Sequence, residues 1–300
     1  MTKNKILFGS GLVVLSALGF GSMPILAKFA YKGGITIPTL LFIRFGIAAV
    51  ILFIYVIIKY GVPKLSGMNY FYLFILGGVF YTMQSSFYLV SIKYIPTALA
   101  ALILYIFPLL VAIMSAVFFN ERITLKVMAA MFVSFAGLVL ILGTSYGQID
   151  YKGAVFALAA AIVYSLYIVL SNKVVKDLPA PVMSGFISLF TAMGIFSYGA
   201  FAGELHFDFA PQAWVPVIGV ALFSTVFAML AFFKGLDIAG PTRSSILSMA
   251  EPLFTIVLSA MLLRESLSFL QIIGGLGVLA GAVLVIIAQS SHKIIQDEYV

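Results

Sequence analysis

Two stretches of this chain can be written one above the other: LILYIFPLLVAIMSAVFFNER at residues 102–122 and ILSMAEPLFTIVLSAMLLRES at residues 246–266. Both are apolar over most of their length, and a proline, Pro108 or Pro252, stands at the same place in each. A glutamate, Glu251, comes directly before the second proline. A proline inside an apolar helix predicts a kink or a break at that point.

The match between the two stretches continues beyond the prolines. Glu121 aligns with Glu265, and at the same offset Gly137 aligns with Gly281 without a gap. The sequence therefore predicts an internal duplication of about half the chain.

The composition places most of the chain in lipid. Of its 300 residues, 63% are hydrophobic and 9% are charged, whereas soluble domains carry about 25% charged residues. The net charge of +7 comes from basic residues scattered among short connections, not from the clustered patch that nucleic-acid binding requires. The chain has no cysteine, and its two histidines fall in a connection and in the tail, so we expect no disulfide, metal site or cofactor.

A bilayer core about 30 Å thick needs roughly 20 apolar residues of helix to cross it. Apolar runs between charged residues, proline, glycine or asparagine predict ten such helices, joined by short connections that leave no room for a soluble domain. The expected spans are Ile6–Ala27, Ile37–Ile58, Tyr70–Val90, Thr97–Phe119, Leu125–Leu142, Gly153–Ser171, Pro181–Phe201, Trp214–Phe233, Thr242–Leu263 and Leu267–Ala288.

Lysine and arginine residues in short connections predict the orientation of the spans. Most of the 17 basic residues, Lys59 and Arg243 among them, fall on the side that also holds both termini. Both termini are therefore expected in the cytoplasm and the protein in the cytoplasmic membrane. The longest connection, which holds Glu204 and Asp208 but no lysine or arginine, then lies outside.

Five spans fall in each unit, the first at residues 1–146 and the second at residues 147–300. Because five is odd, the second unit enters the membrane from the opposite side. Inverted repeats of this kind recur in secondary transporters, whose sites lie near the midplane between the halves. The sequence thus predicts an all-α polytopic membrane protein, with ten transmembrane helices as two inverted five-helix repeats around a central cavity.

The chain resembles the EamA-type members of the drug/metabolite transporter superfamily. The resemblance is carried by the two five-span halves, by FIRF at Phe42–Phe45, and by the proline-to-glutamate segments that end NER at Asn120–Arg122 and RES at Arg264–Ser266. It covers nearly the whole chain. It implies a small-solute secondary transporter, often an exporter of amino acids or other metabolites, with a cavity lined by the third, fourth, eighth and ninth spans together with the first and sixth.

Polar residues form one stripe along the ninth span. At 100° per residue, one face holds Ser244, Ser248, Glu251, Thr255 and Ser259. Lipid cannot satisfy such groups, so the stripe is expected to face the protein interior or water. Ser248, Glu251 and Thr255 are candidate substrate contacts. Because a charge at this depth costs roughly 2.5–3.5 kcal/mol, Glu251 is also a candidate for taking up a coupling proton; the alternative is a structural hydrogen bond to a neighbouring helix.

Pro252 has no N–H, and its ring crowds the carbonyl of Ser248, which predicts a kink with an open backbone acceptor beside Glu251. Pro252 and its counterpart Pro108 are therefore given structural roles. The counterpart of Glu251 in the first half is Phe107, so the pseudo-symmetry is broken at this position.

The third span carries a second polar face. Gly77, Tyr81, Gln84 and Tyr88 share it, with Ser85 at its edge. An amide near mid-span is costly unless it is satisfied, so Gln84 is expected to face a cavity or to bond across helices. We take Tyr81, Gln84 and Tyr88 as candidate substrate contacts, with helix–helix packing as the alternative.

Three further tyrosines, Tyr105, Tyr164 and Tyr167, are candidate aromatic walls of the cavity, although tyrosines near span ends also serve as interface anchors. Arg44 stands in the outer third of the second span. It could attract anionic solutes or pair with Glu251. The preferred interpretation is structural, a snorkelling guanidinium that holds the second span against its neighbours.

Four more residues are given structural roles from the repeat: Glu121, Glu265, Gly137 and Gly281. The two glutamates end corresponding spans on opposite sides of the membrane, so they are expected to cap the next span or to pair with the arginines beside them. The two glycines are expected to permit close helix approach.

The expected function is secondary transport of a small metabolite, an amino acid or related compound, by alternating access. Export is the expected direction, and proton coupling through Glu251 is a hypothesis. A channel or a membrane-embedded enzyme is the alternative. The first needs polar rings or a charged pore and the second a catalytic constellation at one membrane face, and the sequence indicates neither. The expected partners are the solute, the lipid bilayer and protons, without nucleic acid; substrate identity and oligomeric state are left open.

Overall fold

The computed structural model describes residues 3–95, 97–121, 123–142, 150–264 and 267–297, and every regular element within these ranges is a helix. Ten helical segments there are long and apolar enough to cross a membrane. The elements are α1 (Lys3–Tyr31), α2 (Ile37–Tyr60), α3 (Gly67–Phe74), η1 (Ile75–Tyr81), α4 (Thr82–Ser91), α5 (Thr97–Leu104), α6 (Phe107–Phe119), α7 (Leu125–Leu142), α8 (Tyr151–Val174), α9 (Ala180–Ala202), η2 (Pro211–Ala213), α10 (Trp214–Ala221), η3 (Leu222–Phe227), α11 (Ala228–Ala239), α12 (Pro241–Ser248), α13 (Glu251–Leu263) and α14 (Phe269–Asp297).

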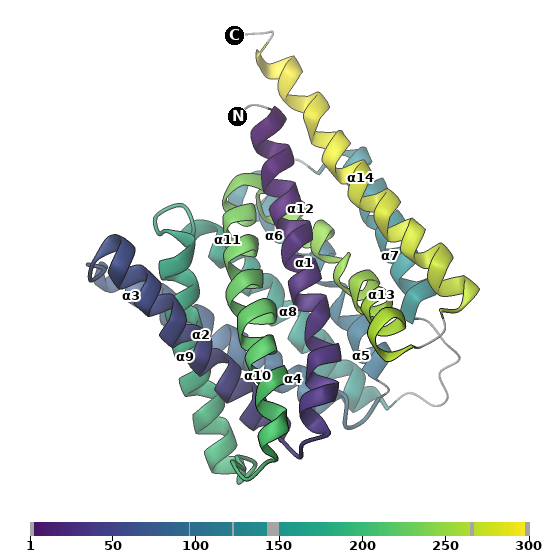
Figure 1. Ribbon diagram of the computed structural model, residues 1–300. Helices are drawn as coiled ribbons and strands as arrows, with labels where there is room; N and C mark the ends of the chain where they lie inside the picture. The colour runs from purple at the N-terminus through teal and green to yellow at the C-terminus, as the bar shows by residue number, and fades with distance from the viewer. Residues whose placement is uncertain (1–2, 96, 122, 143–149, 265–266, 298–300) are drawn as a thin grey trace.

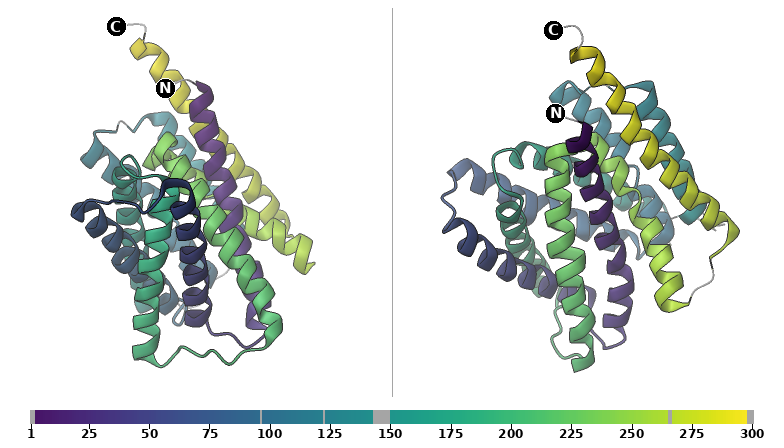
Figure 2. Two further views of the ribbon diagram at one scale, coloured as in Figure 1. Left: turned by 60° about the vertical axis from the view of Figure 1, so that its left-hand side comes forward. Right: turned by 45° about the horizontal axis from the view of Figure 1, so that its top comes forward.

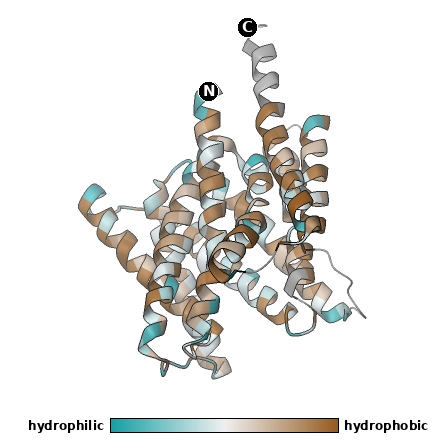
Figure 3. Cartoon of the chain, turned by 45° about the vertical axis from the view of Figure 1, so that its right-hand side comes forward, coloured by the Kyte–Doolittle hydropathy of each residue, from teal (hydrophilic) through white to brown (hydrophobic). Residues whose placement is uncertain are grey.

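The two halves of the chain run in opposite directions through the bundle. Both termini lie at the same end (Figures 1 and 2), and α1 runs away from that end whereas α8, the first helix of the second half, runs toward it. Hydrophilic residues gather near the helix ends and in the connections, while the middle of the bundle is mostly hydrophobic (Figure 3). The arrangement is the inverted repeat of ten spans that the sequence predicts.

The fourth and ninth spans are each broken into two helices at corresponding places. α5 gives way to α6 across Tyr105 and Ile106, and α12 gives way to α13 across Met249 and Ala250. The proline of each span then occupies the first turn of the second helix, where its missing N–H breaks no helical hydrogen bond. A full break therefore replaces the kink expected from the sequence.

The likeness of the two broken spans extends to their ends. The residue directly after each helix, Asn120 after α6 with φ 52° and Arg264 after α13 with φ 56°, is in the left-handed region. Glu265, the expected counterpart of Glu121, lies outside the described residues.

The third and eighth spans each contain a π-helical segment, η1 and η3, which the sequence patterns did not predict. At each segment a backbone carbonyl accepts a hydrogen bond from a threonine hydroxyl five residues later. The Thr82 hydroxyl donates to the carbonyl of Gly77 at 3.0 Å, and the Thr225 hydroxyl donates to the carbonyl of Val220 at 3.1 Å. An inserted residue also rotates the helix face. Gly77, which the pattern places on one face with Tyr81 and Gln84, lies against α9, where a Cβ would stand 2.5 Å from the carbonyl oxygen of Ile187.

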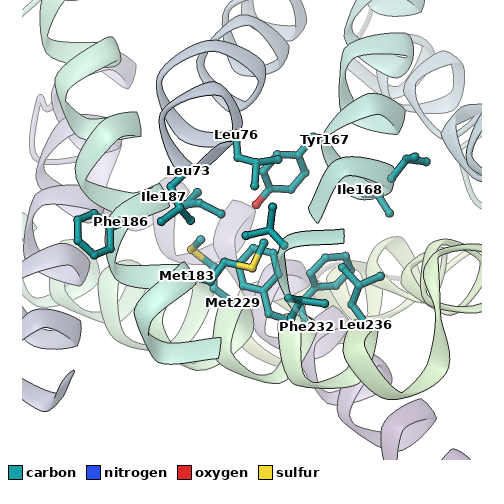
Figure 4. Close-up of a cluster of buried hydrophobic side chains, with 14 of the residues drawn as sticks. Leu73, Leu76, Tyr167, Ile168, Met183, Phe186, Ile187, Met229, Phe232 and Leu236 are labelled. Atoms are coloured by element: carbon teal, nitrogen blue, oxygen red, sulfur yellow. The ribbon is translucent and has the colours of Figure 1, made fainter. Parts of the chain in front are cut away.

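An apolar core joins helices of the first half to helices of the second (Figure 4). It contains side chains of α3, η1, α8, α9 and α11, among them Leu73, Leu76, Tyr167, Ile168, Met183, Phe186, Ile187, Met229, Phe232 and Leu236. Because α8 is part of this core, its Tyr167 is held against Tyr81 of the third span, with ring centroids 5.3 Å apart.

α7 and α14 lie side by side, and glycines bring their backbones into contact (Figure 1). A Cβ on Gly137 would stand 2.5 Å from the carbonyl oxygen of Gly274, and a Cβ on Gly281 would overlap Oγ of Ser134. Both glycines thus lie where small residues permit close helix approach.

Candidate functional site

A cavity of about 640 Å³ lies between the two halves. Its wall includes Tyr31 at the end of α1, Ile37 at the start of α2, Ile92 after α4 and Leu142 at the end of α7. These helix ends lie away from the two termini (Figure 1). The cavity therefore extends from the middle of the bundle toward the end opposite the termini.

The spans that form the cavity differ in one respect from those that the family resemblance implies. The described lining comes from the first to the sixth spans and the ninth, and none of it comes from the eighth span, η2 to α11. The eighth span packs instead on α1 and α2, for example through the hydroxyls of Ser22 and Ser224, which are 2.8 Å apart. The second span takes its place in the wall with Leu41, Arg44 and Phe45.

The structure brings most of the candidate substrate contacts to this cavity. Those that line it are Tyr81, Gln84, Tyr88, Tyr105, Tyr164, Glu251 and Thr255. Their sequence patterns arise in four separate spans, and the two inverted halves place them around one space.

Two candidates are not part of the wall. Ser248 is buried before the break of the ninth span, where its hydroxyl donates to the carbonyl of Ser244 at 2.9 Å. The predicted polar stripe was drawn on one continuous helix. Because the span breaks after α12, the residues before the break do not face the cavity with Glu251 and Thr255. Tyr167 lies in the core behind Tyr164, with ring centroids 5.9 Å apart and ring planes at 13°, so it supports the wall rather than forming it.

Glu251 is the first residue of α13, and its side chain reaches the cavity directly after the break. The hydroxyl of Tyr105, which stands at the corresponding break of the fourth span, is placed to donate to the Glu251 carboxylate. The hydroxyls of Tyr88 and Tyr164 are also close enough to interact with it. The start of a helix favours the ionised carboxylate, and the Tyr105 hydroxyl can donate to that form or accept from the protonated one.

Two neighbouring helices hold the breaks in place. Ser165 of α8 donates to the carbonyl of Phe107 at 3.2 Å, and Thr255 of α13 donates to the carbonyl of Gly21 in α1 at 3.0 Å. A Cβ on Gly21 would stand 2.7 Å from the carbonyl oxygen of Glu251. The close approach of α1 therefore fixes where the Glu251 side chain starts.

Arg44 lies in the wall of the same cavity, with 3% of its surface exposed. Its guanidinium carbon is 4.3 Å from the centre of the Phe45 ring, Nη1 donates to Sδ of Met23 at 2.6 Å, and Nε has no hydrogen-bond partner among the described residues. It is also placed to donate to the Tyr81 hydroxyl oxygen. The guanidinium thus points into the bundle, where an aromatic face and hydroxyl groups surround it, and the snorkelling orientation expected from the sequence is wrong.

Aromatic rings make up much of the remaining wall. The ring of Phe107 packs on that of Tyr164 with centroids 4.8 Å apart, and Phe45 packs on Tyr81 at 5.3 Å. Within the described ranges, no group of three or more histidine, aspartate or glutamate residues could hold a metal ion. A largely apolar cavity of this size with a few polar groups is typical of small-molecule sites.

At the opposite end of the bundle the two halves contact each other directly. The hydroxyl of Thr242 in α12 donates to Oε2 of Glu121, which follows α6, at 2.8 Å. Glu121 does not cap the next span as expected: Thr124 does so, accepting from the backbone N–H of Val127 at 3.3 Å. Arg122, the other expected partner, lies outside the described residues.

Arg243 belongs to this contact, and the sequence analysis missed it. It is 1% exposed and interacts electrostatically with Glu121. Its charge was counted among those of the connections, although the expected ninth span already began at Thr242. Pro241, a residue type favoured in the first turn of a helix, was the available signal that Arg243 already lies inside α12.

Known proteins are similar to this chain in sequence, and a solved structure is similar to it in fold. An uncharacterized transporter of Archaeoglobus fulgidus is 28% identical over 92% of this chain and 96% of its own length. The aromatic amino acid exporter YddG of Ancylobacter novellus is 32% identical over 133 residues, which is 43% of each chain. A crystal structure at 20% identity superposes with a TM-score of 0.79 over 94% of this chain and 98% of the other.

The sequence model of the EamA-like transporter family matches the chain twice, at residues 7–143 and 151–287. The two matches correspond to the two inverted halves, and together they cover most of the chain. The chain therefore belongs to the EamA-like transporter family.

Proposed function

We propose that this protein is a secondary transporter of the cell membrane that exports a small metabolite, an amino acid or a related compound, by alternating access. The observation that carries the proposal is the position of Glu251, a carboxyl group at a helix break inside a cavity between two inverted halves. Discontinuous helices at the interface of inverted repeats are where secondary transporters bind their solutes.

Alternating access is supported by the unequal ends of the bundle. The cavity extends toward the end away from the termini, while at the other end Thr242 of one half bonds to Glu121 of the other. If the two inverted halves move relative to each other so that the open end closes and the closed end opens, a solute is carried across without a continuous pore.

The distribution of charge supports an orientation with both termini in the cytoplasm. Lys59 and Lys173 lie in the last turns of α2 and α8, and Lys234 lies in the second half of α11, toward the end of the bundle that holds the termini. The connection with Glu204 and Asp208, which follows α9, lies at the other end. By the positive-inside rule the cavity then opens outward, as suits the release step of an exporter.

We infer that Glu251 couples transport to protons. The titratable and charged groups that face it come from every neighbouring wall of the cavity: Arg44, Tyr81, Tyr88, Tyr105 and Tyr164. Since none of these is a second carboxylate, a proton entering the site at neutral pH goes to Glu251. Solute and proton then compete for one carboxylate, which gives exchange of solute against proton.

The amino-acid class rests on a relative and on the wall of the cavity. YddG of Ancylobacter novellus is named an aromatic amino acid exporter, and it matches 43% of this chain. The rings of Phe107 and Tyr164 offer the apolar contact that the side chain of such a solute needs.

The experiment that tests the function is counterflow into proteoliposomes with a panel of amino acids and related metabolites. Wild type, Glu251→Gln and Glu204→Gln are compared, each with and without a pH gradient. Glu204, a carboxylate of an exposed connection, provides the control for loss of one negative charge.

We expect wild type and Glu204→Gln to exchange at least one solute at a rate that changes with the pH gradient. Glu251→Gln should lose the response to the gradient. If no solute of the panel is exchanged by the wild type, the carrier proposal is overturned; if Glu251→Gln responds to the gradient as wild type does, the coupling role is overturned.

A further inference from the structure

We propose that the cavity selects zwitterions, with Arg44 binding the carboxylate of the solute and Glu251 its ammonium group. The inference rests on the proposed transport function and deepens it, because it assigns one recognition task to each charged residue of the cavity.

Arg44 has the features of an anion-binding residue. It is 97% removed from solvent by the surrounding protein yet lines the cavity, and its Nε has no partner among the described residues. The acceptor of its Nη1 is the thioether sulfur of Met23, which is a weak acceptor. The planar guanidinium can donate two parallel hydrogen bonds to a carboxylate, which would replace this weak contact with a strong one.

Glu251 supplies the opposite charge from the other half of the chain. Its carboxylate and the hydroxyl oxygen of Tyr105 can both accept from an ammonium group, which carries three donors. Phe107 also lines the cavity, with its ring centroid 5.8 Å from that of Tyr105, and an aromatic ring favours a cation over its face.

The charges of Arg44 and Glu251 do not form a direct ion pair. Arg44 and Glu251 interact electrostatically, and no ion pair of 4.0 Å or less joins these two residues. A solute with one carboxylate and one ammonium group would satisfy both. A simple anion would leave Glu251 without a partner of opposite charge and a simple amine would leave Arg44 without one, and a buried charge that is not balanced by an opposite charge is costly.

The test compares each amino acid with its two matched analogues, the amine that lacks the carboxylate and the acid that lacks the ammonium group. For phenylalanine these are 2-phenylethylamine and 3-phenylpropanoate, and the same triplets are made for the other amino acids of the counterflow panel. Affinity is measured by equilibrium binding to the purified full-length protein. The wild type should bind at least one amino acid tenfold or more tightly than both of its analogues.

Two variants then assign the charges. Arg44→Gln should bind the amino acid and the amine with equal affinity but still bind the amino acid more tightly than the acid. Glu251→Gln should bind the amino acid and the acid with equal affinity but still bind the amino acid more tightly than the amine. Lys173→Gln and Glu204→Gln, which remove one charge outside the cavity, should bind like the wild type. The comparison in the wild type needs no variant, so it stands even where a substitution prevents folding.

The inference is overturned if the wild type binds the amine or the acid as tightly as the amino acid, or if it binds no member of any triplet. It is also overturned if both variants lose the same preference. Counterflow of some other solute under any of these results would leave the carrier function intact, so the two proposals fail separately.

Discussion

The hydroxyl of Thr255 donates to the backbone carbonyl of Gly21 at 3.0 Å, which ties the helix that carries Glu251 to the first helix of the opposite half. The contact needs close backbone approach, and a Cβ on Gly21 would stand 2.7 Å from the carbonyl oxygen of Glu251. The position of the carboxyl group in the cavity therefore depends on the absence of a side chain in α1.

Gly21→Ala should impair transport strongly. The added methyl group would push α1 from α13 or displace Glu251, at a cost of roughly 1–3 kcal/mol for overpacking. We expect counterflow to fall about tenfold and the unfolding temperature to drop by a few degrees. Gly11→Ala, in the same helix but with no atom within 4 Å of the new Cβ, should behave like wild type. Equal activity of the two variants would show that this approach of α1 is not required.

Gly137→Ala should lower stability more than it lowers solute affinity. The new Cβ would stand 2.5 Å from the carbonyl oxygen of Gly274, which forces α7 and α14 apart, and the two helices contribute only Leu142 to the described wall of the cavity. The measurement is the unfolding temperature together with binding affinity. Gly46→Ala, where the Cβ meets nothing within 4 Å, is the control. A lower affinity at unchanged stability would contradict this assignment.

Thr242→Val should open the end of the bundle that holds the termini. It removes a hydrogen bond to the Glu121 carboxylate, and a bond to a charged group contributes about 1.5–3 kcal/mol. The chain has no cysteine, so Ser244→Cys alone, at a position that is 0% exposed, reports access of a thiol reagent. We expect labelling to become roughly tenfold faster.

The control for this opening removes a threonine hydroxyl that bonds one half to the other at the opposite end, where it also accepts from the His206 N–H at 3.0 Å. Thr39→Val deletes a hydroxyl that donates to the carbonyl of His206 at 3.0 Å, and it should not accelerate labelling of Ser244→Cys. Faster labelling in both variants would indicate general loosening rather than opening of one end.

The orientation can be tested in intact cells with a thiol reagent that does not cross membranes. Asp208→Cys, in the long connection, should be labelled from outside, and Lys234→Cys should be labelled only after the cells are opened. The opposite pattern would place both termini outside and would contradict the proposed direction of the cavity.

The spans, the duplication and the prolines at the breaks could all be predicted from the sequence, because hydropathy and helix breakers act locally. The direction of individual side chains could not. Ser248 precedes a break that interrupts the assumed helical stripe, and Gly77 lies within a π-helical segment, η1, that rotates the helix face.

Arg44 and Arg243 show the second limit. An arginine in an apolar span can extend to the interface or turn inward, and the choice depends on partners from distant parts of the chain. Tyr81 faces Arg44, and Glu121 faces Arg243, across the folded bundle. Sequence position alone does not reveal either partner.

The most direct test of the central claim is proton movement driven by solute. Proteoliposomes with a pH-sensitive dye inside receive an outside pulse of a solute that counterflow has identified. Wild type should release protons from the lumen as the solute enters, while Glu251→Gln should exchange solute for solute without moving protons. Equal proton release by Glu251→Gln and wild type would contradict the assignment of coupling to Glu251.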